Sequence, residues 1–238
     1  MKKNEVIGII GGAGVAATNK LNELIENIFT LNGAFRDMHH PEIIIYQATK
    51  APSRSMYLEG KGESFISDYI KIGKKLKSAG ATTLCMSCNT AHYAIDEIQN
   101  EVGLPFINLI EEVVSEIKNT NQKKIGLIAS DGCLMGKVYE KYFDKIYPEA
   151  KIIYPDKIFQ QEVTRGICNI KNINRFKEDS SLDRPKNIFT NVSKHLIKKN
   201  ADIILIGCTD IRVDYFNQNS VDSLEVLAKK IYQKTYEK

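Results

Sequence analysis

The chain has 238 residues, of which 43% are hydrophobic and 26% are charged, and its formal net charge is +4 at pH 7. A chain of this length can bury a substantial core, as one large domain or two small ones, so a soluble globular protein is expected. Its lysines alternate with acidic residues, and no apolar run reaches the roughly 20 residues of a membrane helix. Nucleic-acid and membrane partners are therefore not expected.

The N-terminus reads "MKKNEVIGIIGG". Its apolar stretch is shorter than the ~7–15 residues of a signal-peptide core, so the segment predicts a strand and a cytoplasmic protein. The five cysteines are odd in number and irregular in spacing. They favour free thiols in a reducing compartment over a disulfide framework.

Short β-branched runs alternate with longer amphipathic segments along the whole chain. The predicted strands are "EVIGII", "EIIIYQA", "ATTLCM", "FINLI", "KKIGLIAS", "AKIIYP" and "ADIILIG", and helical patterns between them include residues 18–29 and 64–78. This alternation is typical of an α/β protein with mainly parallel strands. Functional residues are then expected at the C-terminal ends of the strands.

The first loop contains Gly12-x-Gly14-x-x-Ala17, which fits the dinucleotide-binding fingerprint between a strand and a helix. A nicotinamide site also needs an acidic residue at the end of the second strand, but residues 47–49 are Gln, Ala and Thr. What remains is a glycine-rich turn at a helix N-terminus. Such a turn either favours an anion such as a carboxylate or is simply a tight turn without a ligand.

The segment "LCMSCNTAHY" admits three readings of Cys85 and Cys88: half of a metal site, a redox pair, or one working thiol beside a buried one. The other three cysteines and the four histidines lack metal-ligand spacing, so no metal is expected. Cys85 lies inside the predicted strand and should face the core. Cys88 lies beyond it at the start of a predicted helix, where the dipole and the N–H donors lower the pKa of a thiol.

The chain contains an internal echo. "VIGIIGGAG" resembles "KIGLIASDG", and the spacing from Gly8 to Cys88 is 80 residues while that from Gly126 to Cys208 is 82. Each cysteine follows a strand pattern that begins with an alanine seven residues earlier. The echo predicts two similar three-layer α/β halves, related by a pseudo-two-fold axis, each with one cysteine at the end of an equivalent strand.

Two thiols that face one pocket from opposite halves suit the inversion of a carbon centre by proton transfer. One group must act as base on one face and the other as acid on the opposite face, with the roles exchanged in the reverse direction. The α-proton of an amino acid is far less acidic than a thiol, so donors must stabilise the developing carbanion. Asn89, Thr90 and Thr209, together with backbone N–H groups of the glycine-rich turn and of the "ASDG" turn at Ser130, are suitable donors.

The motifs "IGIIGGAGVAAT", "CNTAH" and "GCTD" resemble those of the aspartate/glutamate racemases, and the resemblance covers the chain from end to end. It implies cofactor-independent racemisation of a small acidic amino acid, aspartate or glutamate, with Cys88 and Cys208 as the two acid/base catalysts. It also implies a homodimer. The first half is expected at residues 1–115 and the second at 116–222, with a C-terminal helix at 223–238 that packs back on the first half.

The resemblance also implies roles for the residues around the cysteines. Asn89, Thr90 and Thr209 would hold the α-carboxylate and the amino group, while Arg54 would bind the side-chain carboxylate. Arg165 falls where many members have a lysine for that same carboxylate. Gly12 and Ser130, in the two turns, complete the expected substrate-binding residues.

Several residues depart from the family pattern or remain outside it. The usual Gly-Met-Gly-Pro is Gly-Ala-Gly-Val at residues 12–15, and the common Gly-Cys-Thr-Glu ends in Asp210. Arg212 is expected to pair with Asp210 or Asp214 at the surface, and His92 to be a structural, hydrogen-bonded histidine. Three alternatives stay open: a sibling decarboxylase or isomerase that uses one cysteine, a nicotinamide oxidoreductase, and a ligand-binding module without turnover.

Overall fold

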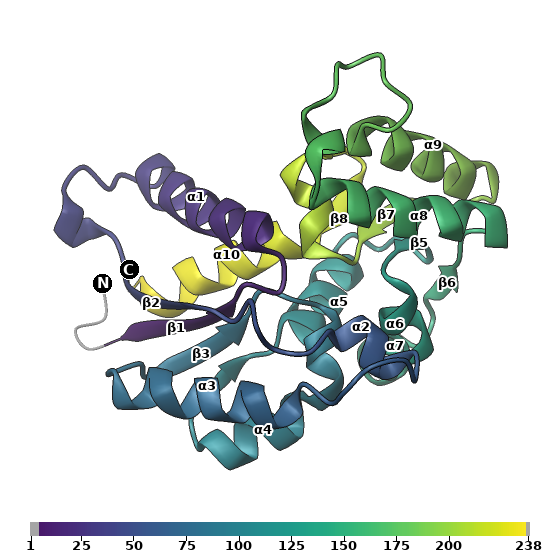
Figure 1. The fold of residues 1–238 in the computed structure, drawn as a ribbon. Helices are drawn as coiled ribbons and strands as arrows, with labels where there is room; N and C mark the ends of the chain where they lie inside the picture. Colours follow the sequence, from purple (N-terminus) through teal and green to yellow (C-terminus); the bar gives the residue numbers. More distant parts are fainter. Residues whose placement is uncertain (1–4, 237–238) are drawn as a thin grey trace.

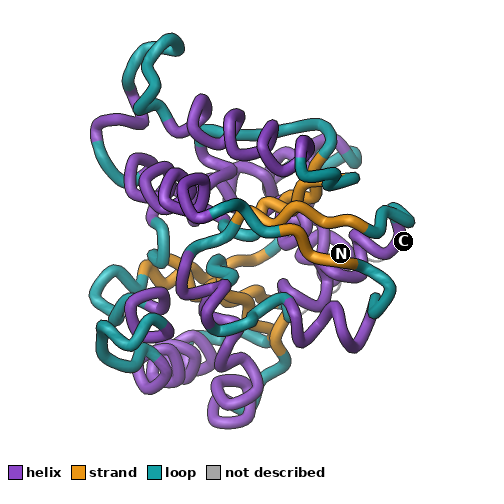
Figure 2. Tube along the Cα trace, turned by 90° about the vertical axis from the view of Figure 1, so that its right-hand side faces the viewer, coloured by secondary structure: helices purple, strands orange, loops and turns teal. Residues whose placement is uncertain are grey.

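The computed structural model describes residues 5–236 and contains two four-stranded sheets that are parallel throughout (Figure 1). The first sheet has the strand order β2-β1-β3-β4, and the second has the corresponding order β6-β5-β7-β8. Figure 2 shows the strands of both sheets enclosed by helices. The fold is therefore α/β with two similar halves, as the sequence echo predicts.

The first sheet consists of β1 (Val6–Gly11), β2 (Glu42–Gln47), β3 (Thr83–Met86) and β4 (Phe106–Ile107). The helical segments between and after these strands are α1 (Val15–Leu31), η1 (Asp37–His39), α2 (Arg54–Leu58), α3 (Ile66–Ser78), η2 (Thr90–Ala94), α4 (Ile95–Val102) and α5 (Leu109–Asn119), where η marks a 3-10 helix. The predicted boundary at residue 115 falls inside α5, and the division of the chain there stays a prediction.

The second sheet consists of β5 (Lys124–Ile128), β6 (Lys151–Ile153), β7 (Ile203–Ile206) and β8 (Ser220–Asp222). Its helical segments are α6 (Asp131–Met135), α7 (Glu140–Ile146), α8 (Lys157–Ile170), η3 (Ile173–Phe176), α9 (Pro185–Lys198), η4 (Thr209–Val213) and α10 (Ser223–Thr235). Within residues 5–236, no helix has the length and apolar character needed to cross a membrane.

The echo in the sequence reflects the same packing in both sheets. Gly8 lies opposite Leu84 in the β1–β3 pair, and Gly126 lies opposite Ile204 in the β5–β7 pair. A Cβ on Gly8 would lie 2.3 Å from the Leu84 side chain, and a Cβ on Gly126 would lie 3.0 Å from that of Ile204. Leu84 and Ile204 each lie four residues before a cysteine. Glycine is thus required at the positions of β1 and β5 that these two side chains cross.

Two predicted elements need correction. "FINLI" was expected as one strand, but β4 ends at Ile107 and α5 begins at Leu109. The change occurs at Asn108, whose side chain accepts a hydrogen bond from the Glu111 N–H and so caps the helix. β8 was not predicted, because its three residues, Ser-Val-Asp, are too few to show a periodic pattern.

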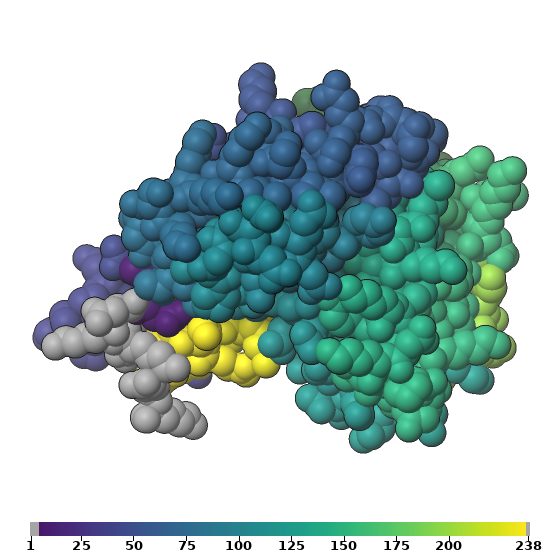
Figure 3. All heavy atoms as spheres, turned by 90° about the horizontal axis from the view of Figure 1, so that it is seen from below, coloured from purple at the N-terminus to yellow at the C-terminus, as the bar shows by residue number. Residues whose placement is uncertain are grey.

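The largest hydrophobic cluster joins the two halves. It contains buried side chains from β1 and β5, from α1 and α5, and from the last helix, α10. α10 follows β8 of the second sheet but packs against α1 and α5 (Figure 1). Figure 3 likewise shows the yellow residues of α10 beside the purple and blue first half, away from much of the green second half.

Candidate active site

The two cysteines singled out by the sequence follow equivalent strands. Cys88 comes two residues after the end of β3, and Cys208 comes two residues after the end of β7. All strands in each sheet are parallel, so the turns after β1, β3, β5 and β7 lie at the C-terminal edges of their sheets. Cys85, inside β3, is completely buried, as predicted, and burial raises its pKa to about 12.

Both cysteines line one cavity of about 240 Å³. Its walls also contain five of the predicted substrate-binding residues, Arg54, Asn89, Thr90, Ser130 and Thr209. Four charged residues that were not among the predicted site residues also line it: Glu59, Asp131, Lys171 and Asp210. The cavity therefore brings three thiols, including that of Cys168, several hydroxyls and five charged side chains into one place.

A second cavity, of about 610 Å³, adjoins the first and is lined by the glycine-rich turn, including Gly12. The two cavities share Ser53, Arg54, Lys171 and Asp210. The Gly12 N–H is not free for a ligand, because it donates to the Thr18 hydroxyl at 2.9 Å. The glycine-rich turn is thus closed by its own helix, and Gly12 lies in the outer cavity rather than beside the thiols.

Asn89 is held by a buried hydrogen-bond network. Its Oδ1 accepts from the Tyr139 hydroxyl at 2.7 Å, and its Nδ2 donates to Ser223 Oγ at 3.0 Å. Tyr139 and Ser223 lie outside the first sheet and its helices, so this network fixes the turn after Cys88 against the rest of the molecule. The network leaves the Asn89 side chain one amide hydrogen for a substrate.

A second buried hydrogen bond joins the turns that carry the two cysteines. The Thr209 hydroxyl, next to Cys208, donates at 2.9 Å to the carbonyl oxygen of Ser87, next to Cys88. The hydroxyls of Thr90 and Ser130, which also line the cavity, lie 3.1 Å apart and likewise connect the halves. Through these contacts, residues of both halves fix the positions of the two thiols relative to each other.

Arg54 is the first residue of α2, which the Ser53 side chain caps by accepting from the Met56 N–H. Its Nη1 donates to the Pro52 carbonyl at 3.0 Å, while its Nε is buried and has no hydrogen-bond partner among the described residues. Burial acts to lower the pKa of Arg54, but its electrostatic interactions with Cys88, Tyr69 and Asp210 and its hydrogen bond with Cys88 more than offset this effect, so the pKa is raised. Arg54 is a fixed cation beside Cys88.

Lys171 is the functional candidate that sequence reasoning missed. Its Nζ lies 3.0 Å from Asp210 Oδ2, and the Asp210 side chain is 5% exposed. Lys171 immediately follows α8, six residues after Arg165. Thr164, Ile167 and Cys168 of α8 line the cavity together with Lys171, at positions i, i+3, i+4 and i+7 of one helix face, and Arg165 does not lie on that face.

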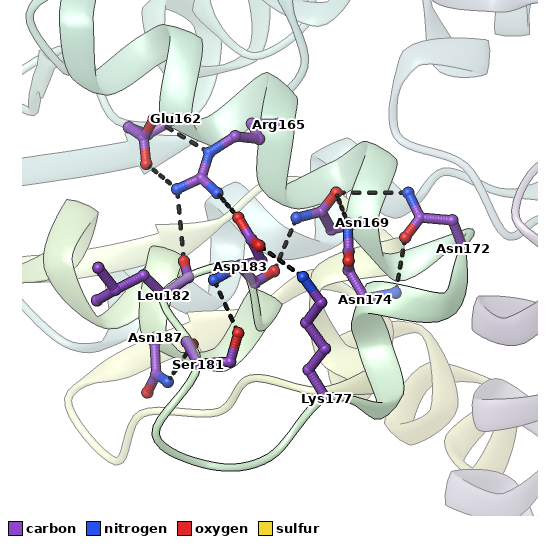
Figure 4. A network of polar contacts seen from close by, with 10 residues as sticks. All are labelled: Glu162, Arg165, Asn169, Asn172, Asn174, Lys177, Ser181, Leu182, Asp183 and Asn187. Carbon is purple, nitrogen blue, oxygen red and sulfur yellow. Dashed lines mark hydrogen bonds and ion pairs between the residues drawn. The ribbon is translucent and has the colours of Figure 1, made fainter.

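Arg165 lies apart from the residues that line the cavity. Its guanidinium pairs with Glu162 and, at 2.9 Å, with Asp183, which also pairs with Lys177 (Figure 4). The resemblance assigns Arg165 to the side-chain carboxylate of a substrate, but the structure places it in this surface network on the outer side of α8. Lys171 is the cation of this region that reaches the cavity.

Burial sets the protonation state of the second thiol. It raises the pKa of Cys208 to about 12, and the charge of Asp210 adds to the increase while Lys171 opposes it. The pKa-lowering effect that we expected for a thiol at such a turn is therefore outweighed at Cys208. Without substrate, this residue is a protonated thiol at neutral pH.

Two further residues near the cysteines have structural partners. His92 Nε2 accepts from the Leu109 N–H at 3.2 Å, so its Nδ1–H donates to the Cys88 carbonyl at 2.9 Å, as expected for a structural histidine. Arg212 pairs with Asp222 at 2.6 Å, not with Asp210 or Asp214, and lies over the Phe216 ring. The expected partners were wrong because Asp214 pairs with Arg184 and Asp210 pairs with Lys171.

Comparisons with known proteins agree on one family. The family described as Asp/Glu/Hydantoin racemase matches residues 6–228. The broad specificity amino-acid racemase RacX of Bacillus subtilis is 26% identical over 231 residues, which cover 94% of this chain and 95% of RacX.

Solved structures share the fold. The aspartate racemase of Picrophilus torridus superposes with a TM-score of 0.78 at 23% identity and covers 97% of this chain and 94% of its own. The glutamate racemase RacE1 of Bacillus anthracis superposes with a TM-score of 0.66 at 19% identity, with 98% and 83% covered.

Proposed function

The chain belongs to the Asp/Glu/Hydantoin racemase family, and on this premise we propose that it racemises a small acidic amino acid, aspartate or glutamate, by proton transfer between Cα and two cysteines without a cofactor. The observation that carries the proposal is the single cavity lined by both Cys88 and Cys208. An amino-acid racemase needs an acid and a base on opposite faces of one carbon, and two strand-end thiols from equivalent halves meet that need.

In one direction of the proposed reaction, the Cys88 thiolate removes the α-proton and the Cys208 thiol gives its proton to the opposite face of Cα. The Cys208 thiol is suited to the second step because burial keeps it protonated at neutral pH. The reverse direction exchanges the two roles. Each sulfur must come within roughly 3–3.5 Å of Cα, so we expect the two sulfurs about 7 Å apart when substrate is bound.

The donors around the cavity supply the stabilisation that the carbanion requires. We propose that Thr90 and Thr209, with the remaining Asn89 amide hydrogen and the Ser130 hydroxyl, bind the α-carboxylate and the amino group. Arg54 and Lys171 lie together on another part of the wall and would bind the side-chain carboxylate. Lys171 takes the role that the resemblance alone assigned to Arg165. Gly12 would contribute only through the wall of the outer cavity.

The proposal is tested by incubating both enantiomers of aspartate and glutamate in deuterated water, with a chelator and without added cofactor. The product enantiomer should carry deuterium at Cα, because the incoming proton comes from a thiol that exchanges with solvent. Cys88→Ser and Cys208→Ser should each lose racemisation by several orders of magnitude, since a hydroxyl is a poor base near neutral pH.

The two serine variants should also differ from each other. Each should retain α-proton exchange only for the enantiomer that its remaining thiol faces. Cys168→Ser is the matched control, because Cys168 also lines the cavity but is exposed and has no proposed role. Normal racemisation by Cys208→Ser, with Cys88→Ser inactive, would instead support chemistry that uses one cysteine.

The resemblance also leads us to propose a homodimer located in the cytoplasm. Light scattering of the purified protein across a range of concentrations measures its mass directly. A mass of one chain at all concentrations would contradict the dimer.

A further inference from the structure

One buried tyrosine outside the cavity is hydrogen-bonded to a residue that lines it. Tyr139 comes directly before α7 in the second half and is completely buried. Its hydroxyl donates to Asn89 Oδ1 at 2.7 Å, although the two residues are 50 positions apart in the chain. Asn89 directly follows Cys88 and lines the cavity, whereas Tyr139 does not line it. Tyr139 is therefore placed to act on a substrate through Asn89.

The contacts of Asn89 determine how its side-chain amide is oriented. Burial raises the pKa of the Tyr139 hydroxyl well above its ordinary value, so the phenol keeps its hydrogen and can donate it. The acceptor of an amide side chain is its carbonyl oxygen. At the other end of the amide, the NH₂ group donates to Ser223 Oγ at 3.0 Å. The oxygen is thus held toward Tyr139 and the nitrogen toward Ser223.

The opposite orientation of the amide would change what Asn89 offers to a ligand. The two orientations differ by a half-turn about the last side-chain bond, and they fill nearly the same space because oxygen and NH₂ are similar in size. In the observed orientation, one hydrogen of the NH₂ group remains for an acceptor such as a carboxylate. After a half-turn, the carbonyl oxygen would take the place of that NH₂ group and repel the carboxylate.

We propose that Tyr139 is a positioning residue for racemisation, which holds the Asn89 amide so that an N–H, and not the carbonyl oxygen, meets the α-carboxylate of the substrate. This inference rests on the proposed function, in which Asn89 is one of the substrate-binding residues. As the α-proton leaves, negative charge moves from Cα onto the α-carboxylate, so the N–H bond strengthens in the transition state. Its loss should lower kcat more than it raises KM.

Tyr139→Phe removes the donor and keeps the ring, and steady-state racemisation of aspartate and glutamate measures the effect. We expect kcat/KM to fall by about 10- to 100-fold, the effect of a buried polar group that loses its partner, with most of the loss in kcat. Rates are divided by the folded fraction of each sample, determined by circular dichroism. An unchanged kcat would overturn this inference, whereas a wild-type protein that racemises neither amino acid would overturn the proposed function.

A double-mutant cycle shows whether Tyr139 acts through Asn89. Asn89→Ala removes the amide, so it should lower kcat/KM at least as much as Tyr139→Phe does. In the Asn89→Ala background, Tyr139→Phe should cause almost no further loss, because the group that the tyrosine holds is absent. A merely structural contribution of Tyr139 would lower activity in both backgrounds. If the two losses multiply in the double variant, the inference is wrong.

Asn89→Asp tests the same hydrogen bonds from the other partner, and it leaves Tyr139 intact. The introduced carboxylate keeps an oxygen for the Tyr139 hydroxyl but has no N–H for the substrate. Its kcat should therefore fall at least as far as that of Asn89→Ala. Activity near that of the wild type would show that the reaction does not need an N–H at this position, and the inference would fail.

Tyr142→Phe is the matched control. Tyr142 is a buried tyrosine of α7, and its hydroxyl accepts at 2.8 Å from the side chain of Asn108, which does not line the cavity. The same hydroxyl is thus removed from another asparagine, and kcat and KM should equal those of the wild type. An equal loss of kcat in the two phenylalanine variants would assign the effect to a general disturbance of the buried tyrosines and overturn the inference.

Discussion

At the scale of single residues, Asp210 also affects the thiol beside it. Its charge raises the pKa of Cys208, and Lys171 only partly compensates. Replacing Asp210 with Asn removes the negative charge and leaves Lys171 unpaired, so the pKa of Cys208 should fall. In Asp210→Asn, the rate at which iodoacetamide alkylates Cys208 should therefore begin to increase at a lower pH than in the wild type. Mass spectrometry of samples alkylated across a range of pH measures this rate.

The exposed thiol of Cys168 in the same protein molecule is the internal control for that measurement, and its alkylation profile should change little. If the alkylation rate of Cys208 depends on pH in the same way in the wild type and in Asp210→Asn, the charge of Asp210 does not affect the pKa of that thiol.

His92 makes a pH-dependent contribution to stability. Burial lowers its pKa to about 4, while in the unfolded chain the value is near 6.5. A depressed histidine pKa means that the unfolded state takes up a proton first, so stability is full above about pH 6.5 and decreases as the pH falls toward 4. Between about pH 7.5 and pH 5, His92 should account for a loss of about 2 kcal/mol in the free energy of unfolding.

Urea denaturation of the wild type and of His92→Gln at the two pH values measures this contribution. The variant lacks the titrating ring and should lose about 2 kcal/mol less than the wild type over the same pH range. The comparison uses the change with pH, so a uniform loss of stability in the variant does not affect it. Equal losses in the two proteins would show that His92 is not the group responsible.

At the scale of elements, the turn before α1 tests how closely Asp210 is packed. Gly14 has a φ of 116° and no room for a Cβ, whereas Gly80, after α3, has a φ of 104° and no atom within 4 Å of the place where a Cβ would be. Gly80→Ala should destabilise by about 1 kcal/mol from backbone strain alone. Gly14→Ala carries the same strain and must also displace the Asp210 carboxylate, so it should lose more stability and most activity.

Thermal denaturation and racemase assays on the two alanine variants make the comparison. If Gly14→Ala keeps full activity and loses no more stability than Gly80→Ala, the close contact with Asp210 is not important.

The elements also show what the sequence could and could not reveal. The glycines and alanines that recur before Cys88 and Cys208 form local sequence patterns. These patterns correctly predict two equivalent strands with a cysteine after each. The choice between Arg165 and Lys171 depends on which side of α8 faces the cavity. The sequence position at which the family resemblance expects a cation does not determine that side. The close packing of Asp210 Oδ1 against Gly14 is a contact between the halves that no local pattern encodes.

At the scale of the whole molecule, Thr209 connects the two cysteine-bearing turns through its hydrogen bond to the Ser87 carbonyl. Thr209→Val removes the donor and keeps the shape, which should cost about 1 kcal/mol of stability and lower kcat by about a hundredfold, because small displacements of reacting groups slow the reaction strongly. Thr209→Ser retains the hydroxyl and is the matched control.

Steady-state kinetics of the two variants provide the measurement. Because the hydrogen bond positions the turns, kcat should change more than KM in Thr209→Val. A change confined to KM would indicate that the hydroxyl only binds substrate.

The path of the chain to α10 has a consequence for biosynthesis. α1 is made on the ribosome well before α10, the helix that covers it. The apolar faces of α1 and α5 therefore stay open until α10 has been made, and closing them requires contacts of very high sequence separation, which form slowly. Nascent chains arrested before Ser223 should be cleaved rapidly by proteases in the first half, and release of the C-terminus should make that half resistant.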